Sequence, residues 1–206
     1  MVKPAAWPLL VAGGIFWGLF FCGSQLLAFQ FDEGELGRLT SGEVVVRTDA
    51  SGGQGNDRVQ AAILIDGPAE TIWKTIHDCR QAREFIPGLK GCRVLDRDKA
   101  GEVIEHRMQI SRLLPEVKYV FRAEYQRYRR IDFKRTEGDL REFEGSWVLE
   151  AFDPEKPRTL VVYSLFLDAG LLLPQWAAQM ILRQDLPEIL RSLRNRVSSQ
   201  PPGPAK

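Results

Sequence analysis

Hydrophobic and polar positions alternate along the part of the chain that follows Gly88, over about eighty residues. A period of two is typical of β-strands with one buried face, because successive side chains point to opposite sides of a strand. Turn-forming residues interrupt the alternation at 99–101, 137–139 and 153–157. The pattern predicts an antiparallel meander with strands at 92–96, 103–111, 118–128, 130–135, 143–152 and 160–167.

Two further strands are predicted before the meander, at 44–49 and 59–65. Residues 51–57 join them and have the composition of a hairpin connection, without the Gly-Lys-Ser/Thr ending of a phosphate-binding loop. The residues 32–41 that precede the first of these strands are polar and rich in turn formers.

Two short helices are predicted between the second strand and the meander. Pro68 begins the first, in which Ile72 and Ile76 lie one helical turn apart. The second covers 78–85 and ends at Ile86-Pro87-Gly88, since proline has no amide donor and glycine permits left-handed backbone.

The last predicted element is a long amphipathic helix from 174 to 198. Pro187 lies inside it and predicts a kink or a break near 184–186. The proline-rich residues 200–206 give no reason for order, so the predicted domain spans 42–199.

These elements predict an α+β fold, in which a curved antiparallel sheet of six or seven strands surrounds the long C-terminal helix. A concave sheet and a helix need not touch everywhere, so we expect a cavity between them. The alternative is a packed core without a void, because an aromatic stripe on a strand more often fills a core. The predicted cavity wall consists of Trp73, Phe85, Pro87, Met108, Tyr119, Phe121, Trp147, Tyr163, Trp176 and Met180.

The first thirty residues have a different composition. Residues 5–29 carry no charge, and Lys3 supplies a short positive region before them. Such a run is long enough to span a bilayer, and small residues within it offer cleavage sites for a signal peptidase. We expect residues 1–30 to be a signal peptide or a membrane anchor that places the domain outside the cytoplasm; a buried core helix is the alternative.

Export would place Cys79 and Cys92 in an oxidising compartment, where a disulfide between them can persist. The alternative is that both are small buried hydrophobic residues. The sequence leaves both possibilities open.

Composition and charge bear on which partners and cofactors the protein is expected to bind. Lys and Arg number 28 and Asp and Glu number 27, so the net charge of +1 gives no long-range attraction for nucleic acid, and we expect none as a partner. Only two histidines are present, without metal-ligand spacing, and we therefore predict no metal and no cofactor. His77 near the end of the first helix is expected to contact the terminal carbonyl groups.

His106 is the one candidate for proton transfer, because it shares its strand phase with Met108 and is expected to face inward. Tyr119 and Tyr163 are its candidate catalytic partners. The alternative is a core histidine that hydrogen-bonds to a neighbour.

Several motifs resemble the START-like (SRPBCC) superfamily, above all its polyketide cyclase/dehydrase and coenzyme Q-binding branch. They are Ile65-Asp66-Gly67-Pro68-Ala69-Glu70-Thr71-Ile72-Trp73, Asp78, and Phe85-Ile86-Pro87-Gly88 leading into Cys92-Arg93-Val94-Leu95. The resemblance implies a helix-grip fold that binds an apolar molecule such as a lipid, sterol, quinone or polyketide. Several branches are enzymes, so the fold does not decide the chemistry. The apolar N-terminal segment departs from the soluble members.

Three functions are compatible with these features. The first is non-enzymatic binding or transfer of a lipid-like ligand, such as a lipid, a quinone or a polyketide-like molecule. The second is a polyketide cyclase/dehydrase-like enzyme that uses a cavity histidine and tyrosine. The third is a membrane-tethered interaction or assembly protein whose cavity is filled by its own side chains. The oligomeric state and the ligand stay open.

Overall fold

The computed structural model describes residues 30–49, 58–109, 111–153, 155–170 and 181–200. The apolar N-terminal segment, the connection at 51–57, Trp176, Met180 and the tail at 201–206 lie outside these described residues. In chain order the elements are α1 (Glu33–Thr40), β1 (Val45–Asp49), β2 (Arg58–Asp66), α2 (Ala69–His77), α3 (Cys79–Phe85), β3 (Leu89–Arg97), β4 (Gly101–Met108), β5 (Val117–Gln126), β6 (Arg130–Gly138), β7 (Glu142–Asp153), β8 (Arg158–Asp168), the π-helix η1 (Ile181–Asp185) and α5 (Leu186–Ser198).

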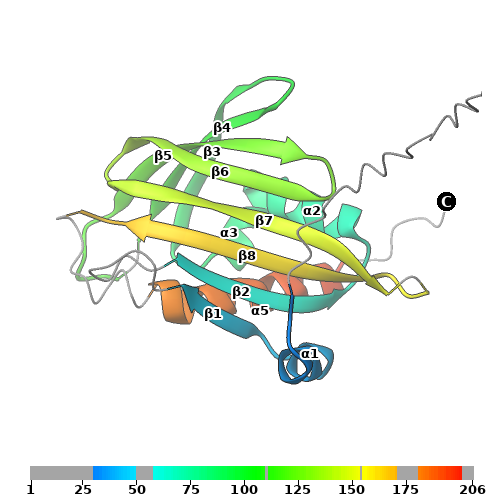
Figure 1. Ribbon diagram of the computed structural model, residues 1–206. Helices are drawn as coiled ribbons and strands as arrows, with labels where there is room; N and C mark the ends of the chain where they lie inside the picture. Colours follow the sequence, from blue (N-terminus) through cyan, green and yellow to red (C-terminus); the bar gives the residue numbers. More distant parts are fainter. Residues whose placement is uncertain (1–29, 50–57, 110, 154, 171–180, 201–206) are drawn as a thin grey trace, which may run out of the picture. The chain divides into compact units, whose positions relative to one another are not determined.

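The strands form one antiparallel sheet in the order β1-β2-β8-β7-β6-β5-β4-β3, with α2, α3 and α5 behind it in the view of Figure 1. The predicted α+β helix-grip fold is confirmed. The sheet has eight strands rather than six or seven, because both strands before the short helices join it. The link is the pairing of β2 with β8, which places the first hairpin beside the last strand of the meander.

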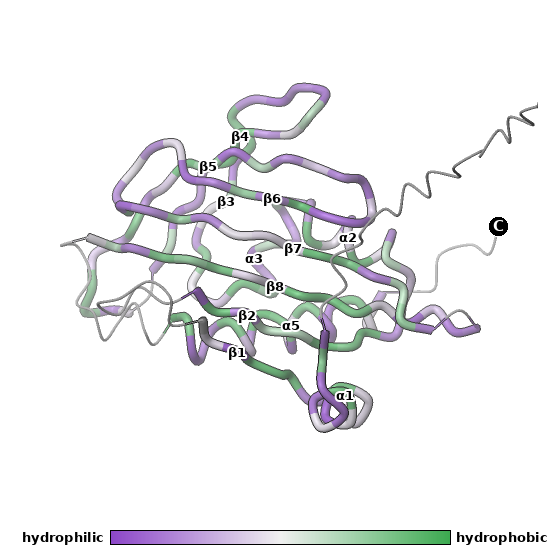
Figure 2. The backbone as a smooth tube through the Cα atoms, viewed as in Figure 1, coloured by the Kyte–Doolittle hydropathy of each residue, from purple (hydrophilic) through white to green (hydrophobic). Residues whose placement is uncertain are grey.

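Helix α5 covers the concave side of the sheet through one apolar face. Leu186, Leu190, Leu193 and Val197 recur at spacings of three and four, and all are buried. Strand β8 is hydrophobic over most of its length, whereas β6 is mostly hydrophilic (Figure 2). The core therefore lies between α5 and the middle of the sheet.

Helix α1 is an element that the sequence pattern does not predict. The Asp32 carboxylate accepts a hydrogen bond from the Glu35 amide at 2.8 Å, and the Glu35 side chain accepts one from the Asp32 amide at 3.1 Å. This reciprocal pair is a capping box, which stabilises the first turn of a helix. The segment 32–41 has few apolar positions, so hydrophobic periodicity gives no sign of the helix.

The C-terminal helix changes its geometry just before Pro187. Residues 181–185 form a π-helical turn, and the regular α-helix begins at Leu186. Pro187 has no amide to donate to the carbonyl of Arg183, so the regular hydrogen-bond ladder cannot run through this point. The irregularity lies where Pro187 predicts it. No helix among the described residues is long and apolar enough to cross a membrane.

A disulfide joins Cys79, the first residue of α3, to Cys92 in the edge strand β3. The two Cα atoms are 5.4 Å apart, within the range that a disulfide can bridge. The bond attaches α3 to the edge of the sheet, and α3 also packs against the C-terminal helix α5.

Candidate functional site

A cavity of about 130 Å³ lies between the concave side of the sheet and the helices. Every strand from β3 to β8 contributes to its wall, together with α2, α3, η1 and α5. The lining residues are Ile76, His77, Cys79, Ala82, Phe85, Ile86, Cys92, Ile104, His106, Met108, Val117, Tyr119, Phe121, Ala123, Tyr125, Ile131, Phe133, Leu140, Phe143, Trp147, Tyr163, Leu165, Leu167, Ile181 and Ile189.

The size of the cavity limits what fits without movement. An apolar cavity of about 150 Å³ holds one benzene molecule. This space therefore accommodates about one six-membered ring, and a larger ligand requires the wall to move. Several lining residues are only partly buried, and among them are Ile86 after α3, Met108 at the end of β4 and Ile181 in η1.

Six of the predicted wall residues line this cavity: Phe85, Met108, Tyr119, Phe121, Trp147 and Tyr163. Their convergence follows from strand alternation, which places every second residue of a strand on the same face. Trp176 and Met180 lie outside the described residues. Trp73 and Pro87 are not part of the wall. At the end of α3, Ile86 takes the place predicted for Pro87.

Trp73 packs against other aromatic rings instead. Its ring stacks on His77 at 4.6 Å and meets Tyr125 and Tyr128 edge-on at 5.6 and 5.7 Å. Its indole N–H is buried and has no hydrogen-bond acceptor among the described residues. Helical spacing indicates that Trp73 is buried. It does not indicate whether the ring lies in the cavity wall or packs against the neighbouring aromatic rings.

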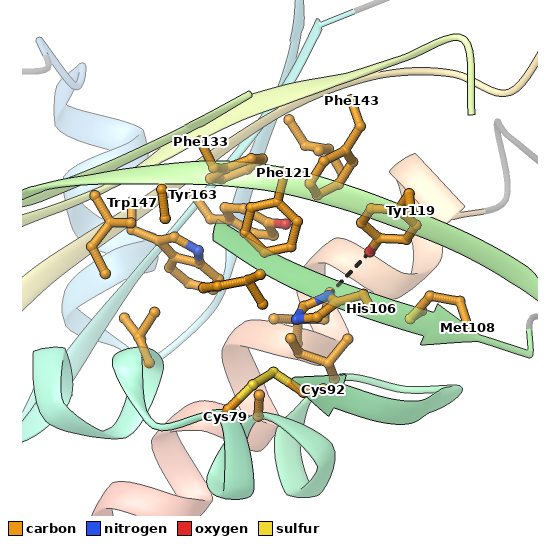
Figure 3. A pocket seen from close by; sticks show the side chains of 18 of the residues that line it. Cys79, Cys92, His106, Met108, Tyr119, Phe121, Phe133, Phe143, Trp147 and Tyr163 are labelled. Carbon is orange, nitrogen blue, oxygen red and sulfur yellow. Dashed lines mark hydrogen bonds between the residues drawn. A yellow bond between two sulfur atoms is a disulfide. The ribbon is translucent and has the colours of Figure 1, made fainter. Parts of the chain in front are cut away.

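Phe133 and Phe143 are wall residues that the predicted set lacks. Their rings lie 4.9 Å apart, and Phe143 lies 4.7 Å from the ring of Tyr119. Figure 3 shows these rings gathered with Phe121, Trp147 and Tyr163 on one side of the cavity. The signal is present in the sequence, since both residues occupy inward positions of their strands.

Trp147 and Tyr163 form a flat part of the wall. They are directly paired neighbours on β7 and β8, and their rings stack 3.9 Å apart with planes 5° from parallel. The indole N–H of Trp147 and the hydroxyl of Tyr163 have no hydrogen-bond partner among the described residues. Both groups are therefore free to bond a ligand.

His106 and Tyr119 form a polar pair in this wall. They are paired across β4 and β5, and His106 Nδ1 lies 3.3 Å from the Tyr119 hydroxyl (Figure 3). Burial lowers the pKa of His106 from 6.5 to about 3 and raises the pKa of Tyr119. Both groups are therefore neutral near pH 7. The tautomer of the imidazole sets whether the Tyr119 hydroxyl donates to Nδ1 or accepts from it.

The low pKa of His106 predicts that the protein loses stability in mild acid. Between pH 6.5 and pH 3 the unfolded chain binds a proton that the folded chain excludes, so the unfolding free energy decreases as the pH falls. The slope is at most about 1.4 kcal/mol per pH unit, which amounts to about 2 kcal/mol between pH 7 and pH 5. Urea unfolding at these two pH values measures the loss.

His106→Phe is the matched variant for this measurement, because it keeps a ring of similar size and removes the titrating group. The difference in unfolding free energy between pH 7 and pH 5 should be about 2 kcal/mol smaller in the variant. Equal differences in both proteins would contradict a buried neutral His106.

His77 does not bond to helix-terminal carbonyl groups, which corrects the sequence-based prediction. Its Nε2 lies 3.5 Å from a carboxylate oxygen of Glu102.

Among the described residues, no group of three or more potential metal ligands is present.

Comparison with known proteins places the chain in a family. The family model for polyketide cyclase/dehydrase and lipid transport matches residues 65–194, which is more than half of the chain. The matched region runs from the end of β2 to the middle of α5 and includes the whole cavity wall. No curated protein sequence matches the chain significantly.

Solved structures share the fold at low sequence identity. TTHA0849 from Thermus thermophilus is 22% identical with a TM-score of 0.59, over 69% of this chain and 99% of that one. The Zhui aromatase/cyclase from Streptomyces sp. R1128 is 15% identical with a TM-score of 0.58, over 75% and 94%. The STAR-related lipid transfer protein from Xanthomonas axonopodis is 15% identical with a TM-score of 0.61, over 82% and 97%.

These likenesses confirm the START-like resemblance that the motifs between Ile65 and Leu95 indicate. The region that the family model matches contains the whole cavity wall, and the fold is the one that the motifs imply. The chain belongs to the polyketide cyclase/dehydrase and lipid transport family.

Proposed function

We propose that this protein binds and carries an apolar small molecule in the cavity and does not transform it. The observation that carries this proposal is the character of the wall, in which aliphatic and aromatic side chains from every side surround a neutral histidine–tyrosine pair. Burial of apolar ligand surface at roughly 25 cal/mol per Å² supplies the binding energy. Candidate ligands are lipids, quinones and polyketide-like molecules.

A cyclase/dehydrase-like enzyme is the second candidate, and the His106–Tyr119 contact is the observation in its favour. General acid–base catalysis is most efficient when the pKa of the catalytic group lies near the working pH. The pKa of His106 is about 3, and burial raises the pKa values of Tyr119 and Tyr163. None of the three groups changes its protonation state near pH 7, which favours carriage over catalysis.

The proposed entrance lies between the end of α3 and the C-terminal helix. Ile86 and Ile181 line the cavity from these two elements and are both partly exposed. A methionine, Met108, borders the same region, and its flexible side chain can adapt to ligands of different shape.

The proposed location is outside the cytoplasm, with the apolar N-terminal segment as signal or anchor. The Cys79–Cys92 disulfide supports this proposal, because such bonds persist in oxidising compartments. The cavity then serves a ligand of the membrane or of the space beside it.

Identification of a co-purifying ligand tests the function. We would express the full chain, separate membrane and soluble fractions, purify the protein natively and extract it with organic solvent for mass spectrometry. The carrier proposal predicts one apolar compound at a stoichiometry near one per chain. A matched preparation of Phe121→Asp, in which the wall carries a charge, should yield none.

Two outcomes would contradict the carrier proposal. Conversion of an extracted compound into a second compound by the purified protein would favour the enzyme. An equal yield of the compound from the wild type and from folded Phe121→Asp would place it outside the cavity.

A further inference from the structure

A second polar cluster lies at the other end of β4 and β5 from the His106–Tyr119 pair. Its centre is Glu102, a carboxylate near the start of β4 that is only 2% exposed. The Tyr125 hydroxyl donates a hydrogen bond to Glu102 Oε2 at 3.0 Å, and the Arg97 guanidinium pairs with Oε1. His77 Nε2 approaches Oε1 at 3.5 Å.

The orientation of the His77 ring is fixed from three sides. Trp73 stacks on one face at 4.6 Å, and Tyr125 meets the ring at 4.9 Å. Glu102 holds the Nε2 edge. The side chain is 28% exposed, yet the residue lines the cavity. A ring at the end of a helix would otherwise be free to turn.

The contact with Glu102, at 3.5 Å longer than an ordinary hydrogen bond, biases the position of the ring proton of His77. A carboxylate only accepts hydrogen bonds, so it favours the tautomer with the proton on Nε2. Nδ1 then carries a lone pair. No described residue donates a hydrogen bond to Nδ1. Glu102 already has an arginine and a tyrosine as partners, so its burial does not require His77.

The two histidines of the cavity wall differ in which ring nitrogen is already in contact with a neighbour. For His106 it is Nδ1, which lies against the Tyr119 hydroxyl, and for His77 it is Nε2, which lies against Glu102. The two sites lie at different places along β5, since Tyr119 and Tyr125 are six residues apart on that strand.

We propose that His77 binds a hydroxyl group of the ligand through Nδ1, with Glu102 as the positioning residue. This inference rests on the proposed binding function and specifies the ligand further. The ligand class is an apolar molecule that carries a phenolic or alcoholic hydroxyl, in contrast to a pure hydrocarbon chain. The hydroxyl donates to the imidazole while the apolar remainder lies against Ile76, Ile104 and Phe121.

Phenol and toluene are the probes for this inference, because they differ only by a hydroxyl in place of a methyl group and each is close to the size that the cavity admits. Their affinities for the full chain are measured by NMR titration. His77→Phe keeps the stack on Trp73 and removes the acceptor. We expect the affinity for phenol to fall about tenfold, the effect of one lost hydrogen bond, and the affinity for toluene to change less than about twofold.

Two further measurements separate a ligand contact from a structural role. The ¹⁵N resonance of His77 Nδ1 should shift with phenol and stay unchanged with toluene. Glu102→Gln should also weaken phenol binding, because an amide can donate to Nε2 and move the ring proton to Nδ1. Lys74→Ala, an exposed change on the same helix, should leave both affinities unchanged.

The outcomes distinguish this inference from the proposed function. If a folded His77→Phe protein keeps the wild-type ratio of phenol to toluene affinity, the hydroxyl site is wrong while the apolar cavity stands. If the wild type binds neither probe, both the cavity function and the hydroxyl site are overturned. A phenol-dependent shift at His106 alone would also reject His77 as the binding group.

Discussion

Phe121→Asp should lower the affinity of the protein for toluene by more than about 100-fold. Phe121 is 7% exposed and lies in the cavity wall, with His106 at 4.9 Å and Phe143 at 5.5 Å between ring centroids. A carboxylate at this position either remains ionised and draws water into the cavity or loses its charge at a cost of several kcal/mol. In both cases an apolar ligand loses its dry environment. NMR titration with toluene measures the effect.

Phe121→Leu is the control, because leucine keeps an apolar surface at the same point. It should bind toluene within about fivefold of the wild type, since a small apolar difference is worth about 1 kcal/mol or less. Near-UV circular dichroism shows whether the aspartate variant is folded. If a folded Phe121→Asp protein binds toluene like the wild type, Phe121 does not contact the ligand. Binding would then not depend on the apolar cavity wall.

Leu193→Ala should reduce the unfolding free energy by about 3 kcal/mol. Leu193 is fully buried on the face of α5 that packs against β2 and the short helices. Truncation removes apolar contacts and leaves a void that a rigid sheet cannot close. Urea unfolding followed by circular dichroism gives the value from the shift of the transition midpoint.

Arg191→Ala is the matched control on the same helix. The Arg191 side chain is half exposed, and its ion pair with Glu188 lies on the surface, so the expected change is within about 0.5 kcal/mol. A Leu193 variant no less stable than this control would mean that α5 does not hold the sheet as described.

The small cavity has a consequence for both proposed functions. A space of about 130 Å³ holds one ring, whereas a lipid or a polyketide-like molecule needs more. Binding of such a ligand requires movement of side chains or of the C-terminal helix. The π-helical turn at 181–185 and the partly exposed Met108 border the cavity, and we expect the movement there.

The local pattern of the sequence was sufficient for most of the fold. Period-two alternation located the strands of the meander, and Ile86-Pro87-Gly88 located the end of the second short helix. Strand alternation placed Tyr119 and Phe121 on one inward face of β5, and both line the cavity. These features depend on a few adjacent residues, which is why sequence alone determined them.

Only the tertiary structure decided which distant residues meet. The pairing of His106 with Tyr119, the stack of Trp147 on Tyr163 and the Cys79–Cys92 bond all depend on the register between strands and on where α3 lies. The sequence placed Trp73 in the cavity wall and did not single out Glu102 at all. Burial on a helix face is a local property, whereas the choice among buried surfaces and the pKa of a buried histidine depend on everything that packs around them.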